Sequence, residues 1–426
     1  MNSAASEPGG RGARYALALL LAVNLLNYVD RQALYAVFPL IKADLHLSDT
    51  GLGVIGSAFM LCYMLSAPIF GRLGDRTSRA HLAAGGLAVW SLATMLSGLA
   101  ASYRMLLAAR TLVGVGEASF GTVSPGLLAD YFPRERRGRM LSLFFLAIPV
   151  GSALGYILGG QLGQAFGWHT AFLLVGLPGL FLAVPLYFLY DPRQSPDQSD
   201  LLPREPFLPE LHRFWLNRTY VRATASMAAM TFALGGLAQW VPSFLQRSFA
   251  LEIARGNTLF GIITVVSGII GTLAGGWLGD RFQRRSHTGY LYVSAVGFLC
   301  GAPLMIIALT SSNLTVCLTA IFGAELFLFL NTGPLNTVLV NVVAPGRRAM
   351  GFAINIFAIH ALGDAISPAM IGSLSDCWGL PRALLITPLA VLIAASFAFW
   401  GGRHAKEDQG TAENTSICKP RPAPDM

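Results

Sequence analysis

The stretch ARYALALLLAVNLLNYVDRQALYAVFPL, residues 13–40, decides the class of fold. It exceeds the about 20 mostly apolar residues that an α-helix needs to cross a bilayer. It also carries two opposite charges, Asp30 and Arg31, in its interior. Because a charge at that depth costs roughly 3 kcal/mol or more, a charge kept there marks a candidate functional site. The sequence therefore predicts a membrane-spanning helix whose two charges have a use.

Similar apolar stretches recur along the whole chain of 426 residues, which is 54% hydrophobic and only 12% charged. Soluble domains are about 25% charged on average. We expect no cleaved signal peptide, because the first apolar run lacks a small-residue cleavage site. The five cysteines are scattered, so we expect neither a disulfide nor a metal site. The chain is predicted to be an all-α integral membrane protein with twelve transmembrane helices, at residues 14–41, 50–72, 80–101, 104–130, 138–165, 169–190, 219–246, 257–279, 288–309, 313–343, 348–375 and 381–402.

Lysine and arginine are distributed unevenly between the two sides of the predicted membrane. With a cytoplasmic N-terminus, 23 of the 30 basic residues lie on the cytoplasmic side. Five lie on the outer side, namely Lys42, Arg104, Arg247, Arg255 and Arg382. Because basic residues accumulate in cytoplasmic loops, we predict that both termini are cytoplasmic. This placement accounts for the net charge of +8, so we expect no nucleic-acid partner.

A six-residue motif occurs twice. Gly71-Arg-Leu-Gly-Asp-Arg76 follows the second span, and Gly276-Trp-Leu-Gly-Asp-Arg281 follows the eighth span, 205 residues later. A repeat of this length predicts two pseudo-symmetric halves of six helices each, which is typical of secondary transporters. The predicted parts are a cytoplasmic tail, a first half, a Pro-rich cytoplasmic linker, a second half and a disordered cytoplasmic tail, at residues 1–13, 14–190, 191–218, 219–402 and 403–426.

These motifs resemble those of a known family. The two G-x-L-G-D-R loops, and RTLVGVGE at residues 110–117, resemble motifs of the major facilitator superfamily. Further stretches resemble its Spinster branch, namely LNYVDR at 26–31, GEA at 116–118, QWVPSFL at 239–245, GPLN at 333–336, HALGDAISP at 360–368 and SD at 375–376. The resemblance covers nearly all of residues 15–400. It implies the major facilitator fold and transport of lysophospholipid-like or sphingosine-phosphate-like lipids by alternating access, with protons as the coupling ion and no other cofactor.

The resemblance and the predicted topology also suggest the protein's partners and its location. We expect a monomeric bacterial homologue in the inner membrane. Its partners are expected to be the lipid bilayer and an amphipathic anionic lipid substrate.

Four charges in the first half form the principal candidate site. Asp30 and Arg31 lie about 100° apart on a helix, so each needs another partner, and Arg110 and Glu117 in the fourth span are the candidates. Arg31 and Arg110 fit an anionic headgroup, because guanidinium binds phosphate bidentately. Asp30 and Glu117 are candidate proton carriers, since burial favours a protonated carboxyl and a nearby arginine favours the ionised form. The alternative is a fixed salt-bridge cluster that only orders the two helices.

Other polar residues are weaker candidates. Asn27 and Tyr28 lie on a polar stripe of the first span, and Gln239 and Trp240 lie in the seventh. All four are candidate substrate-binding residues, although helix-to-helix hydrogen bonding explains the asparagine equally well. A possible second polar site, with a buried His–Asp hydrogen bond as its alternative, consists of Glu325, His360 and Asp364.

The repeated loops suggest a gate on the cytoplasmic side. Carboxylates are favourable near helix N-termini, so the loop aspartates are placed to latch that side shut. The predicted latch residues are Asp75, Arg76, Asp280 and Arg281. Three further arginines are interpreted as setting topology alone, namely Arg79, Arg284 and Arg285. Glycines that recur every four residues in the fifth span are explained by close helix packing, namely Gly151, Gly155, Gly159 and Gly163.

The sequence leaves two other functions to compare with lipid transport. A transporter of small organic anions or drugs has the same architecture and remains an alternative. A membrane-embedded enzyme lacks support, because the sequence contains no HExxH, no GxSxG and no histidine cluster at metal-binding spacing. The sequence also contains no GxxxxGK[ST] loop, so we expect that ATP does not drive transport.

Overall fold

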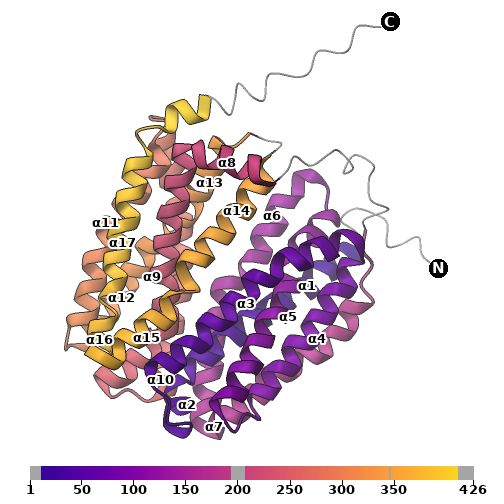
Figure 1. Ribbon diagram of the computed structural model, residues 1–426, viewed down its shortest axis with the longest axis vertical. Helices are drawn as coiled ribbons and strands as arrows, with labels where there is room; N and C mark the ends of the chain where they lie inside the picture. The colour runs from indigo at the N-terminus through magenta and orange to yellow at the C-terminus, as the bar shows by residue number, and fades with distance from the viewer. Residues whose placement is uncertain (1–10, 193–206, 345–346, 411–426) are drawn as a thin grey trace, which may run out of the picture. The chain divides into compact units, whose positions relative to one another are not determined.

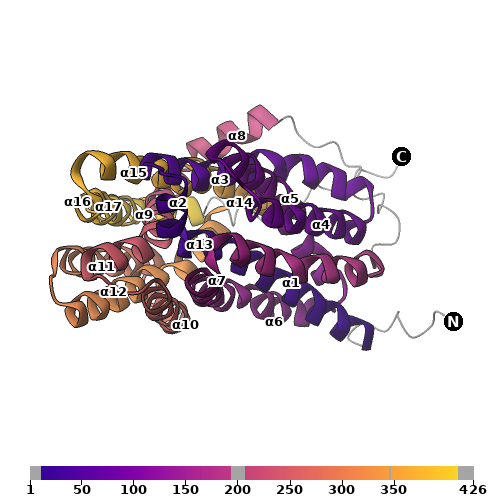
Figure 2. The ribbon, with the colours of Figure 1, turned by 90° about the horizontal axis from the view of Figure 1, so that it is seen from below.

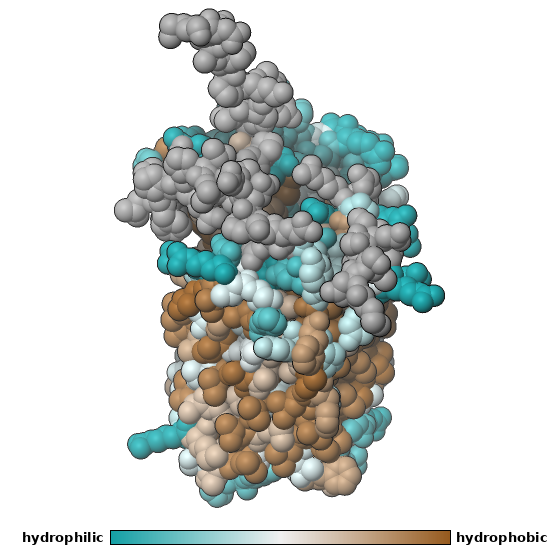
Figure 3. Space-filling view, turned by 90° about the vertical axis from the view of Figure 1, so that its right-hand side faces the viewer, coloured by the Kyte–Doolittle hydropathy of each residue, from teal (hydrophilic) through white to brown (hydrophobic). Residues whose placement is uncertain are grey.

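The computed structural model describes residues 11–192, 207–344 and 347–410. Within these ranges the secondary structure is helical and includes no β-strand, so the predicted all-α class is confirmed. Ten helices in the described residues are long and apolar enough to cross a membrane. One face of the molecule carries a band of hydrophobic residues between hydrophilic residues at its two ends (Figure 3). This is the surface that a bilayer requires of a protein embedded in it.

The helices of the first predicted half differ from the predicted spans mainly in where a helix is interrupted or kinked. A kink at Gly167, with a φ of 83°, divides α7 into two parts: the first completes the predicted fifth span, which begins in α6, and the second is the predicted sixth span. α5 is the predicted fourth span, although its polar residues keep it out of the ten most apolar helices. The bounds are α1 Arg11–Ala36, α2 Phe38–Asp44, α3 Asp49–Arg76, α4 Arg79–Ser97, α5 Tyr103–Asp130, α6 Arg134–Phe145 and α7 Ala147–Tyr187.

Serine side chains begin three of these helices. The hydroxyl oxygens of Ser48, Ser78 and Ser102 accept hydrogen bonds from backbone N–H groups in the first turns of α3, α4 and α5. Each cap satisfies one of the four donors that a helix start leaves unpaired. The helix starts are therefore encoded locally, which is why the sequence places them within a few residues.

The second predicted half contains more interruptions. The predicted tenth span is broken before Gly333 and Pro334, and the predicted eleventh contains a π-helical turn, η3. Proline explains the first break, because it cannot donate its backbone nitrogen to the helical ladder. The bounds are α8 Phe207–Leu216, α9 Arg218–Phe249, α10 Ile253–Gln283, α11 Gly289–Thr310, α12 Leu314–Phe329, α13 Thr332–Val342, α14 Arg348–Ile359, η3 His360–Asp364, α15 Ser367–Trp378, α16 Leu380–Ala383 and α17 Ile386–Gly401.

Contacts between residues divide the chain into two compact units with bounds other than the predicted halves. Unit 1 consists of Met1–Leu202, Gly235–Val266 and Asp364–Leu384, and unit 2 consists of the remaining segments. Within unit 1, α5 packs against α3 and α4, and α7 packs against α1 and α4 (Figure 1 and Figure 2). Within unit 2, α11 packs against α12, α13 and α17. The division into halves at residues 191–218 stays a prediction.

Glycines bring α7 very close to α1 in unit 1. A Cβ placed on Gly155 would lie 2.6 Å from the carbonyl oxygen of Val29, and one on Gly151 would lie 2.7 Å from that of Leu25. Only the absence of side chains allows this approach, so the interpretation of these glycines as packing residues agrees with the structure. The contact also fixes the part of α1 that precedes Asp30.

The predicted tails and linker lie partly outside the described residues. The parts of them that the structure does not describe are residues 1–10, 193–206 and 411–426. Residues 405–410 form a helical turn where the sequence predicts disorder. Asp408 accepts a hydrogen bond of 2.8 Å from the backbone N–H of Thr219, which holds this turn against the start of α9.

Candidate functional site

The four charges of the principal candidate site form two ion pairs between α1 and α5. Arg110 Nη1 lies 3.0 Å from Asp30 Oδ1, and Arg31 Nε lies 2.6 Å from Glu117 Oε2. Asp30 and Arg31 point to different parts of α5, because neighbouring residues on a helix face different directions. Each charge of α1 thus finds an opposite charge in α5, and the set is neutral.

Small residues on α5 bring α3 close to this site. A Cβ placed on Gly114 would lie 2.4 Å from the carbonyl oxygen of Phe59, and one on Gly121 would lie 2.3 Å from the hydroxyl oxygen of Tyr63. The close approach places the rings of Phe59 and Tyr63 beside Arg31. α3 therefore supplies an aromatic wall that the sequence pattern does not reveal.

The Asp30–Arg110 pair is sealed from solvent. The two side chains are 4% and 1% exposed. Thr94 on α4 donates its hydroxyl to Asp30 Oδ2, and the guanidinium of Arg110 lies 5.5 Å from the centre of the Phe172 ring. The pair links α1, α4 and α5 in this arrangement, and the predicted role of Arg110 in substrate binding stays a prediction.

The Arg31–Glu117 pair is different, because Arg31 remains partly accessible. Its side chain is 14% exposed, whereas that of Glu117 is fully buried. The guanidinium carbon lies 5.3, 5.1 and 4.8 Å from the ring centres of Tyr28, Phe59 and Tyr63. Such rings stabilise a cation while leaving its hydrogen-bond donors available. Glu117 Oε1 is buried with no hydrogen-bond partner, so this carboxylate has an acceptor oxygen that the ion pair does not use.

The candidate substrate residues of the seventh span are buried rather than open. Gln239 Nε2 lies 3.4 Å from the carbonyl oxygen of Leu52, and Trp240 Nε1 donates to the carbonyl oxygen of Pro368 at 3.2 Å. The Trp240 ring also makes an edge contact with Phe38. Both side chains thus pack between helices of unit 1 in this structure, and their role in substrate binding stays a prediction. Asn27 is also buried, and its Nδ2 has no hydrogen-bond partner.

The three residues of the possible second polar site lie in different surroundings. Glu325 in α12 is buried and accepts a hydrogen bond of 3.1 Å from Ser267. His360 and Asp364 are the first and last residues of the π-helical η3. Asp364 packs tightly against α9, since a Cβ on Gly235 would lie 2.5 Å from its Cβ. The role of these three residues stays a prediction.

The predicted latch residues are exposed at helix ends. Asp75 and Arg76 lie in the last turn of α3. Asp280 accepts a hydrogen bond of 2.7 Å from the hydroxyl of Tyr290, and the guanidinium of Arg281 lies over the Trp277 ring. Their function as a latch stays a prediction.

Arg79, which the sequence assigns to topology alone, is a structural residue. It is buried, and its guanidinium lies 2.8 Å from Asp130 and 2.6 Å from Asp191. Asp191 also accepts a hydrogen bond from the backbone N–H of Arg79. A neighbouring contact joins the same segments: the Tyr131 hydroxyl, whose pKa is raised by burial, donates to the carbonyl oxygen of Tyr190. Arg79 therefore ties the start of α4 to the ends of α5 and α7, a role that its position at a helix N-terminus conceals.

Asp49 is a further polar residue that sequence reasoning missed. It begins α3 and is buried, and Arg247 binds its carboxylate through both terminal nitrogens at 2.6 and 2.8 Å. The sequence signal at this point, Ser48 followed by Asp49, indicates a helix cap and nothing more. Because Arg247 lies 198 residues from Asp49, their ion pair leaves no pattern in the sequence around either residue.

Comparisons with known proteins identify relatives over most of the chain. Residues 20–368 match the family model described as Major Facilitator Superfamily. The bovine (Bos taurus) protein spinster homolog 1 is 38% identical over 387 residues, which cover 84% of this chain and 72% of the bovine protein. Drosophila melanogaster protein spinster is 34% identical over 378 residues, which cover 86% of this chain and 62% of the fly protein. The chain therefore spans less than two thirds of the fly protein's length.

Solved structures show a related fold. A crystal structure of a bacterial homologue of the human lysosomal transporter Spinster, in an inward-facing and unoccupied conformation, superimposes with a TM-score of 0.85. The match covers 93% of this chain and 98% of that one, at 23% sequence identity. The inward-facing and occupied conformation of such a homologue gives a TM-score of 0.82. The predicted fold is thereby confirmed.

Proposed function

Because the chain belongs to the Spinster branch of the major facilitator superfamily, whose members are transporters and not enzymes, we propose that it is a proton-coupled transporter of amphipathic anionic lipids. Lysophospholipids are the substrate class that this proposal favours. The observation that carries it is the Arg31–Glu117 pair, in which a partly exposed guanidinium is bound to a fully buried carboxylate. The proposal includes alternating access, a monomer, cytoplasmic termini and a bacterial inner membrane.

Arg31 is the residue best placed to bind the headgroup. It is the more exposed of the two arginines, and three aromatic rings flank it. A phosphate can accept two hydrogen bonds from one guanidinium, which matches the geometry of an Arg–carboxylate fork. A phosphate that takes two donors of Arg31 including Nε therefore competes with Glu117, which accepts from Nε.

The competition couples the substrate to the proton. When the headgroup takes Arg31, Glu117 is left in a dry environment without its cation. A buried carboxylate in that situation is favoured in its protonated form, because ionisation there lacks both water and a counter-charge. Substrate binding and proton binding thus support each other. Asp30 is bound by Arg110 and Thr94, neither of which contacts the headgroup in this proposal, so we expect it to contribute less to the exchange than Glu117.

The test is uptake into proteoliposomes, with and without a pH gradient. Wild-type protein should take up a lysophospholipid faster when the gradient is present. Glu117→Gln should abolish that response while uptake without a gradient continues, because glutamine mimics the protonated carboxyl. Glu252→Gln is the matched control, since Glu252 is an exposed carboxylate distant in sequence from the site. A normal gradient response in the Glu117→Gln protein would remove Glu117 from the mechanism.

A second comparison separates lipids from small anions. Arg31→Ala should weaken binding of phosphate-bearing lipids more than binding of neutral lipids with the same chain. If both kinds of lipid lose affinity equally, the headgroup assignment is wrong. If wild-type protein transports short organic anions but no lysophospholipid, the function is the alternative one, transport of small anions or drugs.

A further inference from the structure

A second cluster of charges lies in unit 1 where α2 ends and α3 begins. The carboxylate of Asp49 is only 3% exposed and accepts from four donor atoms on three residues. Arg247 Nη1 and Nη2 lie 2.6 and 2.8 Å from it, and Lys42 Nζ lies at 2.5 Å. Ser375 donates its hydroxyl to the same carboxylate at 2.5 Å. One buried carboxylate thus holds together residues of α2, α3, α9 and α15.

The contacts of Asp49 with Lys42, Arg247 and Ser375 form a tie between four helices. Asp376 strengthens this tie by capping α3. Its carboxylate accepts hydrogen bonds from the backbone N–H groups of Asp49 and Thr50, at 2.8 and 2.9 Å. The hydroxyl of Thr50 donates to it as well, at 2.6 Å. The helices also approach closely, since a Cβ on Gly372 would lie 2.3 Å from the carbonyl oxygen of Asp49. The start of α3 can therefore move away from α15 only if both carboxylates release their partners.

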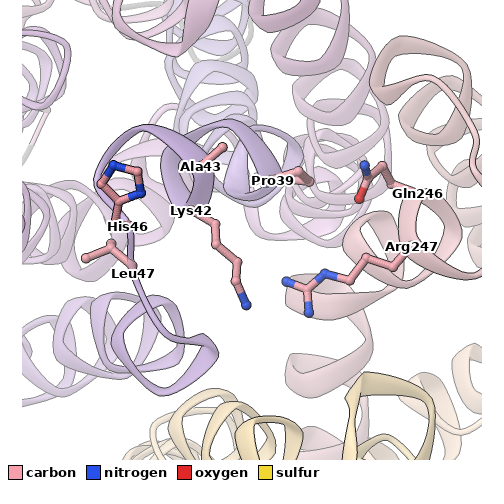
Figure 4. A pocket seen from close by; sticks show the side chains of 7 residues that line it. All are labelled: Pro39, Lys42, Ala43, His46, Leu47, Gln246 and Arg247. Atoms are coloured by element: carbon pink, nitrogen blue, oxygen red, sulfur yellow. The ribbon is translucent and has the colours of Figure 1, made fainter.

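A pocket of about 430 Å³ opens beside this tie, and its lining includes two cations, Lys42 and Arg247. Lys42 and Arg247 extend toward the same open space, with Gln246 and His46 at its edges (Figure 4). The side chains of Lys42 and Arg247 are 35% and 27% exposed, whereas Asp49 is almost inaccessible. A solute in the pocket thus meets the two cations, whereas their carboxylate is not among the residues that line the pocket.

We propose that this pocket is a second anion-binding site, which takes a phosphate monoester group and in doing so draws Lys42 and Arg247 away from Asp49. Arg247 suits this ligand because its planar guanidinium can exchange one two-oxygen acceptor for another. Asp49 cannot stay buried without its cations, because an unpaired buried carboxylate is very unfavourable. Binding of the anion therefore loosens the tie between α3, α9 and α15. The site goes beyond the proposed function and does not involve Arg31.

The test measures binding of phosphate esters to the full-length purified protein by titration calorimetry. All variants carry Arg31→Ala, so a failure of the proposed central site cannot affect the result. Inorganic phosphate and hexyl phosphate represent soluble sources of the group, and lysophosphatidate represents a lipid source. Hexanol, which lacks the phosphate, reports apolar binding alone.

The substitutions change the competition in opposite directions. Asp49→Asn should bind hexyl phosphate about tenfold more tightly, because the competing carboxylate is gone. Arg247→Gln should bind it about tenfold more weakly, and Lys42→Gln should weaken it less while keeping the Asp49–Arg247 fork. Arg255→Gln is the matched control, since it removes an exposed charge from the same predicted side. Unchanged affinity in both the Asp49→Asn and Arg247→Gln proteins would overturn the proposal, and so would an equal loss in the Arg255→Gln protein.

Hydrogen exchange separately tests whether anion binding loosens the contacts between α3, α9 and α15. The amides of Asp49 and Thr50 donate to Asp376, so their exchange reports the state of the tie. Saturating hexyl phosphate should speed exchange of these amides in the protein with Asp49 intact. Binding without faster exchange would overturn the claim that the anion loosens the helices. Stronger binding of lysophosphatidate than of hexyl phosphate would assign the site to a lipid, and the reverse order to a soluble ester.

Discussion

Arg110→Gln should destabilise the protein by about 3–5 kcal/mol, because it leaves the Asp30 carboxylate buried without a cation. The two side chains are 3.0 Å apart and almost inaccessible to water, so solvent cannot replace the lost guanidinium. Asp30→Asn should be costly for the converse reason, since Arg110 then becomes the unpaired charge. The double variant has no buried charge at this position and should recover most of the loss, because replacing both partners of a buried ion pair is close to neutral.

The measurement is the free energy of unfolding in mixed detergent micelles, followed by tryptophan fluorescence, for the four proteins of this double-mutant cycle. Arg137→Gln is the control. Arg137 lies 3.7 Å from Asp130, with both side chains more than a third exposed, so its loss should cost at most about 1 kcal/mol. A coupling energy below about 1 kcal/mol between Asp30 and Arg110 would refute the reasoning, since it would mean that water reaches the pair.

Two further substitutions test the packing and the ion pairs that support the site. Gly155→Ala should destabilise by about 1–3 kcal/mol, because its Cβ would lie 2.6 Å from a carbonyl oxygen of α1. Gly85→Ala, whose Cβ would meet nothing within 4 Å, should be neutral or stabilise by up to about 1 kcal/mol, and equal effects in unfolding experiments would contradict the close contact. Arg79→Gln should cost about 2 kcal/mol, because it removes the cation from two carboxylates. If thermal unfolding shows the same small effect for Arg79→Gln as for the exposed Arg72→Gln, Arg79 serves topology alone.

Much of the fold is readable from the sequence because a bilayer imposes a simple rule. Apolar stretches long enough to span it must be helical, and serine caps such as Ser48 and Ser102 mark where helices begin. The site was partly readable for a related reason. Buried charges are expensive, so Asp30 and Arg31 had to have partners, and Arg110 and Glu117 were the charges in the interior of another predicted span of the same half.

The sequence could not show features that depend on how distant segments meet. Nothing near Arg31 indicates that Phe59 and Tyr63 flank it, because α3 reaches that point through contacts with glycines of α5. The π-helical turn at His360 is hidden for another reason. It changes the helical period without changing composition, so a hydrophobic stretch looks the same with or without it.

The cluster at Asp49 has a consequence for how the chain is made. When Asp49 is added to the growing chain, its capping partner Asp376 is still 327 residues away from synthesis. At about 5–20 residues per second, this interval lasts roughly 15–65 s. Arg247 and Ser375 are also absent for most of it, whereas Lys42, seven residues upstream, is already present. Lys42 is therefore available to neutralise this carboxylate before the later helices are made. We expect its substitution to lower the yield of inserted protein more than the stability of the finished one.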